Sequence, residues 1–407
     1  MKPLRASLCL ALWLGAPALP ALSAGLAPTN THAVIETVAD DYAVVAGTMV
    51  DVKIYRPAGL PLTTNAPVLL YTPGGGTGAD GVIAHPPQHD ALWRMLCGSG
   101  LTVIFLQNTT ESSPGYNFWQ LRGAIVLWGL TNFARFNADF GTQLGAASPA
   151  VVAGWSLGAA TGVQHAGANF GDGDFTDPRI LGCVLFASPA LGAYGGKITS
   201  NGLARITRPV LCIFGTDDLG QPGTYTPGDP PATSPRGRAV AALLQGNAPL
   251  VVAACFQGAN HFEYGSRAAP PGSYEDQRNR YINRLVWDFT DLLLRGLPDC
   301  GPFAGTAWID PAHVAWSDQS CAVAPPPQLR LTPGPPGQWQ LQITNLTRGL
   351  TYLVEGSPTV APGSWTPLAT NAPAPGSNTW QLEVTNSGAP TGFFRVRTGH
   401  PPPAALR

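Results

Sequence analysis

The chain has 407 residues, which gives room for two or three domains with well-formed cores. Only 12% of the residues are charged and the formal net charge is −1, so the composition gives no sign of the basic stripe that a nucleic-acid-binding protein needs. The 48 glycines and 41 prolines predict many loops between the ordered elements.

Residues 1–24 have the pattern of a secretory signal peptide. Lys2 and Arg5 give a basic start, and a short apolar stretch and then small residues follow it. A membrane anchor is the rival interpretation, but glycine and proline interrupt the apolar stretch well before it could span a bilayer. We therefore expect cleavage after Ser23 or Ala24, and a mature protein that is secreted or periplasmic without insertion into the membrane.

The next segment, residues 25–298, alternates apolar strand patterns with helical patterns. The predicted strands lie within residues 33–39, 49–55, 66–78, 101–108, 149–155, 180–189, 208–218 and 248–261. The predicted helices lie within residues 90–97, 116–136, 156–168 and 274–297. This alternation predicts an α/β domain with a mostly parallel sheet covered by helices. Such sheets bind ligands at the carboxyl ends of their strands.

The pattern changes beyond this domain. We assign residues 299–327 to a linker, which ends in the proline-rich stretch "CAVAPPPQ". Residues 328–400 then show short runs of alternating polar and apolar residues, which predict a small all-β sandwich. This tail carries no catalytic cluster. It resembles small β-sandwich modules appended to secreted enzymes, and its role stays open between surface attachment, export sorting and spacing.

Six of the seven cysteines remain after signal-peptide cleavage, and an oxidising compartment permits disulfides. Cys300 and Cys321 lie close together in a loop-rich stretch, so we expect them to pair. Cys183, Cys212 and Cys255 lie inside apolar strand-like runs and are expected to be small buried hydrophobic residues. No C-x-x-C motif and no closely spaced histidine pair indicates a metal site.

The stretch "VVAGWSLGAATG" (Val151–Gly162) raises the first functional question. A strand that enters a helix through a very tight turn would expose the hydroxyl of Ser156 at the helix N-terminus. Gly154 and Gly158 are then needed, because a side chain at either position would collide with the turn. The alternative interpretation is a buried strand followed by a helix of small residues.

A serine hydroxyl is a weak nucleophile that needs a base, and a histidine base needs an acid to hold its tautomer. His261 directly follows the last strand predicted in this domain, and Asp217 and Asp218 directly follow the strand before it. The chain order Ser, Asp, His, with each residue at the end of a strand, is the order found in α/β-hydrolases.

Residues from about 30 to 298 resemble an α/β-hydrolase of the dienelactone hydrolase, platelet-activating-factor acetylhydrolase and cutinase-like polyester hydrolase group. The serine turn, the G-T-D-D and N-H-F stretches and the early "PGGG" agree with that group in order and context. Its acid is usually the third residue after the glycine, which favours Asp218 over Asp217. The resemblance implies a serine carboxylic-ester hydrolase that forms an acyl-enzyme on Ser156 and needs no cofactor or metal.

Two backbone N–H groups are expected to bind the oxyanion of the reaction intermediate. The first is that of Leu157, directly after the serine. The second lies in "TPGGGTG", where we favour Gly75, with Gly76 as the next candidate. This loop resembles the HGGG loop of some esterases, with Pro73 in place of the histidine. A phosphate cradle is the rival interpretation, but the Lys-Ser/Thr pair that should follow it is missing.

Three weaker candidates remain. The aspartates Asp172, Asp174 and Asp177 of "GDGDFTDP" could bind calcium, although we favour a solvated loop. Trp155 could line the cleft or pack in the core. The irregular stretch over residues 219–238 is expected to form a rim or lid over the site.

Other functions fit the sequence less well than that of an esterase. Cutinase-like polyester hydrolases often carry an aromatic residue after the sixth strand, and "FASPALG" has none. A serine peptidase generally carries a large extra domain, and a lipase has a more apolar lid. An inactive secreted binding module would usually have lost one of Ser156, Asp218 and His261. We expect a monomer that acts on a small-molecule or polymeric ester.

Overall fold

The computed structural model places most of the chain in ordered elements. The structure describes residues 26–27, 29–60, 65–75, 90–110, 118–220, 225–226, 229–261, 263, 269–295, 300–303, 306, 308–321, 328–333, 338–344, 351–359, 364–371, 379–385 and 393–399. The expected signal peptide and Gly76 lie outside these residues. In the described part of the chain, no helix is both long enough and apolar enough to cross a membrane.

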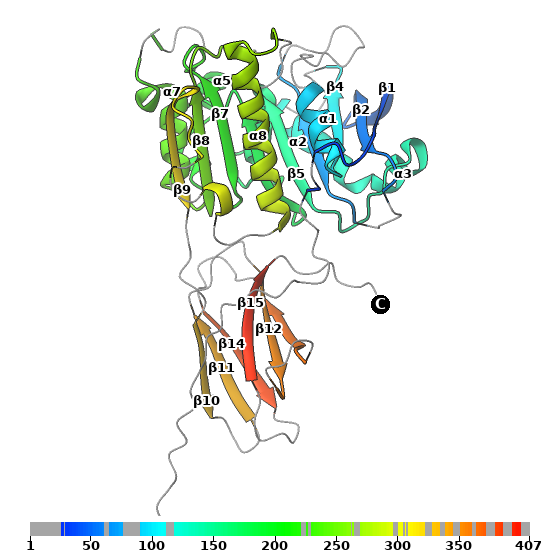
Figure 1. Cartoon of the computed structure of the whole chain (residues 1–407), viewed down its shortest axis with the longest axis vertical. Coiled ribbons are helices and arrows are strands. Elements are labelled where there is room, and N and C mark those ends of the chain that lie inside the picture. The colour runs from blue at the N-terminus through cyan, green and yellow to red at the C-terminus, as the bar shows by residue number, and fades with distance from the viewer. Residues whose placement is uncertain are drawn as a thin grey trace, which may run out of the picture.

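A nine-stranded sheet forms the larger part of the molecule (Figure 1), with the order β1-β2-β4-β3-β5-β6-β7-β8-β9. Its strands are β1 (Val34–Val45), β2 (Thr48–Pro57), β3 (Val68–Thr72), β4 (Thr102–Asn108), β5 (Ala150–Trp155), β6 (Ile180–Phe186), β7 (Val210–Gly215), β8 (Leu250–Phe256) and β9 (Val314–Cys321). The six strands from β4 to β8 in this order run parallel, and only β1, β2 and β9 at the edges are antiparallel to their neighbours. The predicted mostly parallel sheet is confirmed.

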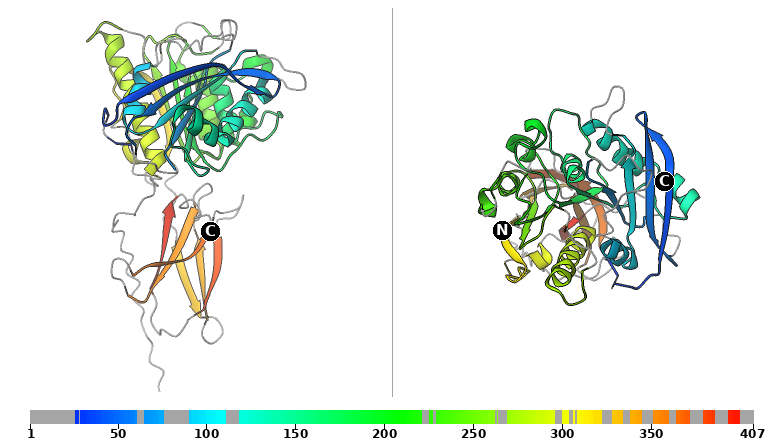
Figure 2. Two further views of the ribbon diagram at one scale, coloured as in Figure 1. Left: turned by 90° about the vertical axis from the view of Figure 1, so that its right-hand side faces the viewer. Right: turned by 90° about the horizontal axis from the view of Figure 1, so that it is seen from above.

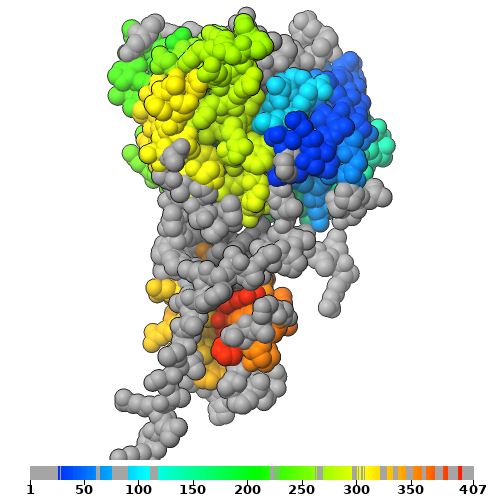
Figure 3. Space-filling model, in the orientation of Figure 1, coloured from blue at the N-terminus to red at the C-terminus, as the bar shows by residue number. Residues whose placement is uncertain are grey.

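Helices cover both faces of this sheet. They are α1 (Asp90–Gly98), α2 (Phe118–Thr131), α3 (Phe133–Phe140), α4 (Leu157–His165), α5 (Ala193–Gly196), α6 (Ser200–Leu203), α7 (Pro235–Leu244) and α8 (Tyr274–Arg295), with 3-10 turns at Pro231–Thr233 and Gly301–Phe303. Helices α1 and α8 pack side by side on one face (Figures 2 and 3), and α2, α3, α4, α6 and α7 pack on the other.

Both faces are therefore buried, and this explains the continuous apolar strands. Successive residues of a strand point to opposite faces. In β3, Val68 and Leu70 pack under α2 and α4, while Leu69 and Tyr71 pack under α1 and α8. A strand in this position needs apolar residues on both sides, so it reads as an unbroken hydrophobic run.

Strand β9 corrects one sequence assignment. We placed residues 299–327 in a linker, but Val314–Cys321 pair with β8 as the ninth strand of the main sheet. Val314 is buried in the core and Trp316 packs against Phe214 of the neighbouring β7, with ring centroids 5.8 Å apart. Local sequence patterns do not identify this strand, because its partners in β8 lie 58 to 71 residues earlier in the chain and its polar residues resemble those of a loop.

The tail forms two small antiparallel sheets, as the alternating pattern predicted. One has the order β10-β11-β14 and the other β13-β12-β15 (Figure 1). These strands are β10 (Gln328–Pro333), β11 (Gln338–Thr344), β12 (Thr351–Ser357), β13 (Thr366–Asn371), β14 (Thr379–Thr385) and β15 (Phe393–Gly399). The sheets share a small core, in which Leu341 and Ile343 of one pack with Tyr352 and Val354 of the other.

The cysteines in the strands behave as small hydrophobic residues. Cys183, Cys212 and Cys255 are free thiols with no exposed surface, as the sequence predicted, and Cys97 on α1 is also free and buried. Burial raises the pKa of the Cys212 thiol to about 12, so it stays protonated at neutral pH. The pairing of Cys300 with Cys321 stays a prediction, because the side chain of Cys321 lies outside the described part.

Candidate active site

Ser156 sits alone between the end of β5 and the start of α4. Its backbone has φ 57° and ψ −114°, a conformation that side chains rarely adopt. Its N–H donates to the carbonyl of Phe186 at the end of β6, 3.0 Å away. A strained non-glycine residue held at a strand-to-helix turn is typical of a residue with a chemical task.

The two flanking glycines are required by close backbone contacts. A Cβ at Gly154 would lie 2.2 Å from the carbonyl oxygen of Gly158, inside the turn itself. A Cβ at Gly158 would lie 2.0 Å from the carbonyl oxygen of Thr72, so there the obstacle is the end of β3 and not the turn. The Thr72 hydroxyl donates to the Gly158 carbonyl at 3.0 Å and fixes α4 against β3.

The structure brings Ser156, His261 and Asp218 together in a line. His261 Nε2 lies 2.9 Å from Ser156 Oγ, and His261 Nδ1 lies 3.0 Å from Asp218 Oδ1. Asp218 is only 2% exposed. Asp217 is exposed, and its carboxylate accepts from the hydroxyl of Thr216 at 3.2 Å. Of the two aspartates that sequence reasoning left open, Asp218 is therefore the one beside the histidine.

Tight packing of two loops places this acid beside this base. Asp217 N–H donates to the carbonyl of Ala259 at 3.1 Å, so the turn after β7 is bonded to the turn after β8. A Cβ at Gly215 would lie 1.9 Å from that same Ala259 oxygen. Only glycine fits between the two turns, and the next residues of each turn, Asp218 and His261, consequently meet.

Arg236 is a residue of the site that sequence reasoning missed. It lies in the first turn of α7 and is 5% exposed. Its Nη2 donates to Asp218 Oδ1 at 2.6 Å, and its Nε donates to the Asp218 backbone carbonyl at 2.7 Å. Its Nη1 donates to the carbonyl of Ala187 at 2.8 Å and to that of Ser188. The guanidinium thus joins the acid to the loop after β6.

The last part of the expected rim or lid over residues 219–238 is a helix instead. Residues 235–238 belong to α7, and the helix begins where Ser234 accepts from the N–H of Gly237 at 3.1 Å. Ser234 followed by Pro235 is a usual way to begin a helix. That signal in "TSPRGR" could have predicted the helix, although not the inward direction of its arginine.

The glycine loop after β3 is held from behind by Arg122 of α2. This buried guanidinium donates to the carbonyls of Pro73 at 2.7 Å and Gly74 at 3.1 Å. A trans peptide points its C=O and N–H in opposite directions, so the Gly75 N–H points away from Arg122. A Cβ at Gly75 would lie 3.1 Å from the Leu157 side chain, so the two residues that carry the favoured oxyanion donors lie side by side. Gly76 lies outside the described residues.

Tyr194 is a second residue that sequence reasoning missed. The stretch "FASPALG" has no aromatic residue after Phe186, the last residue of β6, but Tyr194 comes two residues beyond it. The backbone of Tyr194 is left-handed, with φ 55° and ψ 51°, inside the glycine-rich turn 192–196. This turn brings the phenol back to the site, where it lies close to the Ser156 side chain. Burial raises the pKa of Tyr194, so the phenol stays protonated at neutral pH.

Trp155 packs in the core instead of lining an open cleft. It is 7% exposed, and its indole N–H donates to the His261 backbone carbonyl at 2.7 Å. A Cβ at Gly74 would lie 2.6 Å from the indole ring. The side chain before Ser156 therefore contacts both the loop that carries the histidine and the glycine loop.

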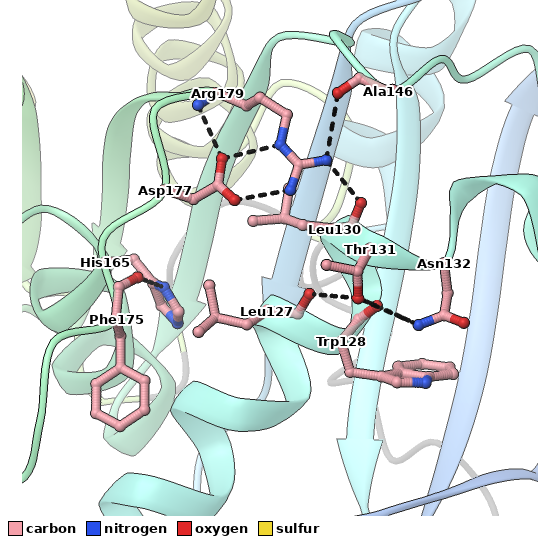
Figure 4. Close-up of polar contacts among 10 residues, drawn as sticks. All are labelled: Leu127, Trp128, Leu130, Thr131, Asn132, Ala146, His165, Phe175, Asp177 and Arg179. Atoms are coloured by element: carbon pink, nitrogen blue, oxygen red, sulfur yellow. Dashed lines mark hydrogen bonds and ion pairs between the residues drawn. The ribbon is translucent and has the colours of Figure 1, made fainter.

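The three aspartates of "GDGDFTDP" have protein partners. Asp172, which is 7% exposed, lies 3.1 Å from the ammonium of Lys197. Asp174 accepts from the N–H and hydroxyl of Thr176, and Asp177 pairs with Arg179 at 2.7 Å (Figure 4). Among the described residues, no group of three acidic, histidine or cysteine side chains is arranged to hold a metal ion.

Comparison with known proteins gives a distant likeness. No protein-family model and no curated protein matches the chain. Esterase 2 of the planctomycete Thermogutta terrifontis, a thermophilic esterase, is similar with a TM-score of 0.44 and 14% identity over 62% of this chain and 90% of that chain. Its propionate-bound form and its form phosphorylated by paraoxon have TM-scores of 0.43 at the same identity and cover 92% of those chains. The chemistry of the site is therefore derived from this chain's own residues.

Proposed function

We propose that the chain is a serine carboxylic-ester hydrolase that forms an acyl-enzyme on Ser156, with His261 as general base and Asp218 as the acid that orients it. The observation that carries the proposal is the unbroken path from Ser156 Oγ through the two His261 nitrogens to Asp218, with contacts of 2.9 Å and 3.0 Å. A nucleophile, a base and an orienting group within hydrogen-bond reach are what nucleophilic catalysis requires.

In the first half of the reaction, Ser156 Oγ attacks the ester carbonyl carbon and His261 Nε2 takes the hydroxyl proton. Asp218 accepts from Nδ1–H, which holds the tautomer with a free Nε2 and stabilises the imidazolium. The C–O bond to the alcohol then breaks, and the alcohol leaves with the proton from Nε2. In the second half, the same nitrogen takes a proton from water, and that water attacks the acyl-enzyme. The bond between the acyl carbon and Ser156 Oγ then breaks, the carboxylic acid leaves, and Nε2 returns its proton to Oγ.

Negative charge develops on the carbonyl oxygen in both halves. We propose that the N–H groups of Leu157 and Gly75 bind it, because preorganised donors in a dry site supply a large share of catalysis. The Arg122 hydrogen bonds to the preceding carbonyls fix the orientation of the Gly75 peptide. Leu157 begins α4, so the positive end of that helix supports the same charge.

We also propose that the protein acts after export, with residues 1–24 removed and Cys300 paired with Cys321. This proposal rests on the sequence pattern of the N-terminus and on the oxidising compartment that it implies. Mass measurement of the exported chain before and after reduction tests it. A start at residue 24 or 25 and one disulfide are expected, and an uncleaved chain would contradict the proposal.

The proposed reaction is tested with a p-nitrophenyl ester of a short acid, such as the butyrate. The wild-type chain is expected to release p-nitrophenolate, and S156A is expected to lose on the order of 10⁶ in kcat. D218N is expected to lose about 10⁴, because the amide favours the wrong histidine tautomer. D217N is the matched control and should stay within about threefold, because Asp217 is exposed and does not contact His261. A folded S156A with wild-type turnover would rule the proposal out.

A further inference from the structure

One carboxylate oxygen of Asp218 contacts both the guanidinium of Arg236 and the imidazole of His261. Oδ1 lies 3.0 Å from His261 Nδ1 and 2.6 Å from Arg236 Nη2. The same Nη2 lies 3.4 Å from His261 Nδ1. The arginine is thus close enough to the imidazole to act on its charge directly, and not only through the aspartate.

The Arg236 guanidinium is fixed by four acceptors. Its Nε and Nη2 hold the backbone and side chain of Asp218, and its Nη1 holds the carbonyls of Ala187 and Ser188. Both side chains of the ion pair are almost fully buried, with 6% and 3% exposure, so solvent screens the pair weakly. A charge held in this way acts on its neighbours with little freedom to move aside.

Two consequences follow for His261. The fixed Asp218 oxygen fixes the plane of the imidazole, which the proton transfer from Ser156 requires. The arginine also opposes protonation of the imidazole, because a second positive charge 3.4 Å away disfavours the imidazolium. Without it, the buried carboxylate alone would stabilise the protonated and inactive base.

We propose that Arg236 is a positioning residue of the triad, which orients Asp218 and extends the neutral, active state of His261 to lower pH. The inference rests on the proposed function of Ser156, His261 and Asp218. It concerns the same site but adds a fourth side chain, and it assigns that side chain control of the acid limit of activity.

Other charged and titratable groups surround this centre, and none of them takes the place of Arg236. Tyr194 from the turn after β6, Asp217 and Tyr225 after β7 and Cys255 in β8 all lie within electrostatic range of Asp218 or Arg236. Glu263 beyond the histidine pairs with Arg278 of α8 at 3.4 Å. Arg122 faces the site from α2. Of these groups, Arg236 is the cation for which a direct contact with both Asp218 and His261 is defined.

The test compares R236M and R236K with wild type in the full-length chain. The measured quantity is the pH at which kcat/KM for p-nitrophenyl butyrate falls to half on the acid side. R236M should raise this half-maximal pH by about one unit, because the imidazolium gains stability. R236K keeps a positive charge, so its half-maximal pH should move by less than half as much. Its kcat should still fall, because lysine cannot make the four hydrogen bonds of the guanidinium.

Arg179 supplies a matched control. It also pairs with an aspartate, Asp177, and also donates to backbone carbonyls, those of Leu130 and Ala146 (Figure 4). It lies at the start of β6, away from the triad. R179M should therefore keep the wild-type half-maximal pH on the acid side. If Arg236 had a purely structural role, its loss would lower activity equally at every pH. An R236M enzyme with the same half-maximal pH as wild type would therefore overturn the inference.

A second readout separates this inference from the proposed function. The protonation midpoint of His261 can be followed by NMR of the imidazole without any substrate, with H261Q used for assignment. R236M should raise this midpoint, or R236Q should if R236M does not fold. An active wild type whose His261 midpoint is the same in these variants would contradict the role of Arg236. An inactive wild type whose midpoint still responds to R236M would contradict the proposed function instead.

Discussion

The indole N–H of Trp155 donates a hydrogen bond to the backbone carbonyl of His261, 2.7 Å away. The residue directly before the candidate nucleophile thus holds the loop that carries the candidate base. The two rings also lie against each other, with centroids 5.2 Å apart. The position of His261 relative to Ser156 is therefore fixed by two contacts. One is the Trp155 hydrogen bond to the His261 backbone, and the other is the contact between His261 Nε2 and Ser156 Oγ.

Trp155→Phe is expected to lower kcat about fivefold with little change in KM. Phenylalanine keeps an aromatic ring in the core but loses the N–H, and one hydrogen bond is worth roughly 1 kcal/mol. Trp287→Phe is the control, because Trp287 of α8 donates to Ser99 after α1 at 3.0 Å, away from the triad. Equal losses in both variants would mean that general destabilisation, and not the His261 loop, explains the effect.

Tyr194→Phe tests the phenol that meets Ser156. We expect the phenol to orient Ser156 Oγ for its attack, so its loss should lower kcat by about 10- to 100-fold while KM stays within a few-fold. Tyr225→Phe loses a phenol that bonds the Asp217 carbonyl at 3.2 Å and should change kcat little. Steady-state kinetics measure kcat and KM for the two variants. A Tyr194→Phe enzyme with the same kcat as Tyr225→Phe would show that the Tyr194 phenol does not assist the reaction.

His165 at the end of α4 predicts how stability depends on pH. It is fully buried, its Nδ1 contacts the Phe175 carbonyl at 2.7 Å (Figure 4), and burial lowers its pKa to about 4. The unfolded chain binds a proton at this residue below about pH 6.5 and the folded chain does not, so the free energy of unfolding falls as the pH drops from 6.5 towards 4. Between pH 7 and pH 5 the expected loss from this residue is about 2 kcal/mol.

Urea unfolding at pH 7 and pH 5 measures this effect. His165→Gln should show a smaller difference between the two pH values than wild type, even if its stability at pH 7 is lower. His32→Gln changes a histidine that is only partly buried and should leave the wild-type difference in place. An identical difference in wild type and His165→Gln would show that this histidine is not the source.

Truncation after Ala324 is expected to keep kcat/KM on a soluble ester within a few-fold of the full chain. Strand β9 ends at Cys321, which pairs with Leu250, the first residue of β8. The chain therefore leaves the main sheet at the amino ends of the parallel strands. Ser156, Asp218 and His261 follow the carboxyl ends, on the opposite side of the sheet. Binding to an insoluble polymer can still change, because a second linked surface raises effective concentration.

A loss beyond about a hundredfold, roughly 2.7 kcal/mol in the barrier, would show that the tail completes the site. Truncation after Ala312 is the informative contrast. It also removes β9 and its Trp316, so the core side of β7 and β8 is exposed. This shorter chain should fail to fold, which would show that the main sheet ends at Cys321 and not near residue 298.

The meeting of Ser156, Asp218 and His261 could be predicted from the sequence because it depends on chain order and strand ends. Each follows an apolar run long enough to identify as a buried strand, and the carboxyl ends of neighbouring parallel strands share one edge of the sheet. Gly154 and Gly215 were part of the same signal, since each removes a backbone collision that any side chain would cause.

Tyr194 and Arg236 could not be predicted in this way. Tyr194 reaches the site only because several consecutive residues of the turn 192–196 have left-handed backbones, and local sequence rules do not say where such a turn leads. Arg236 depends on which carbonyls face the start of α7. Strand β9 has the same difficulty, because long-range pairing and not its own pattern decides that it is a strand.

Covalent labelling tests the central claim most directly. The full-length chain is treated with a fluorophosphonate ester, and the mass of the intact protein and of its peptides is measured. The account predicts one adduct per chain on the Ser156 Oγ atom, none at that position in S156A, and labelling at least 10³-fold slower in H261Q. A folded wild-type chain that forms no adduct, or forms it on another residue, would contradict the account.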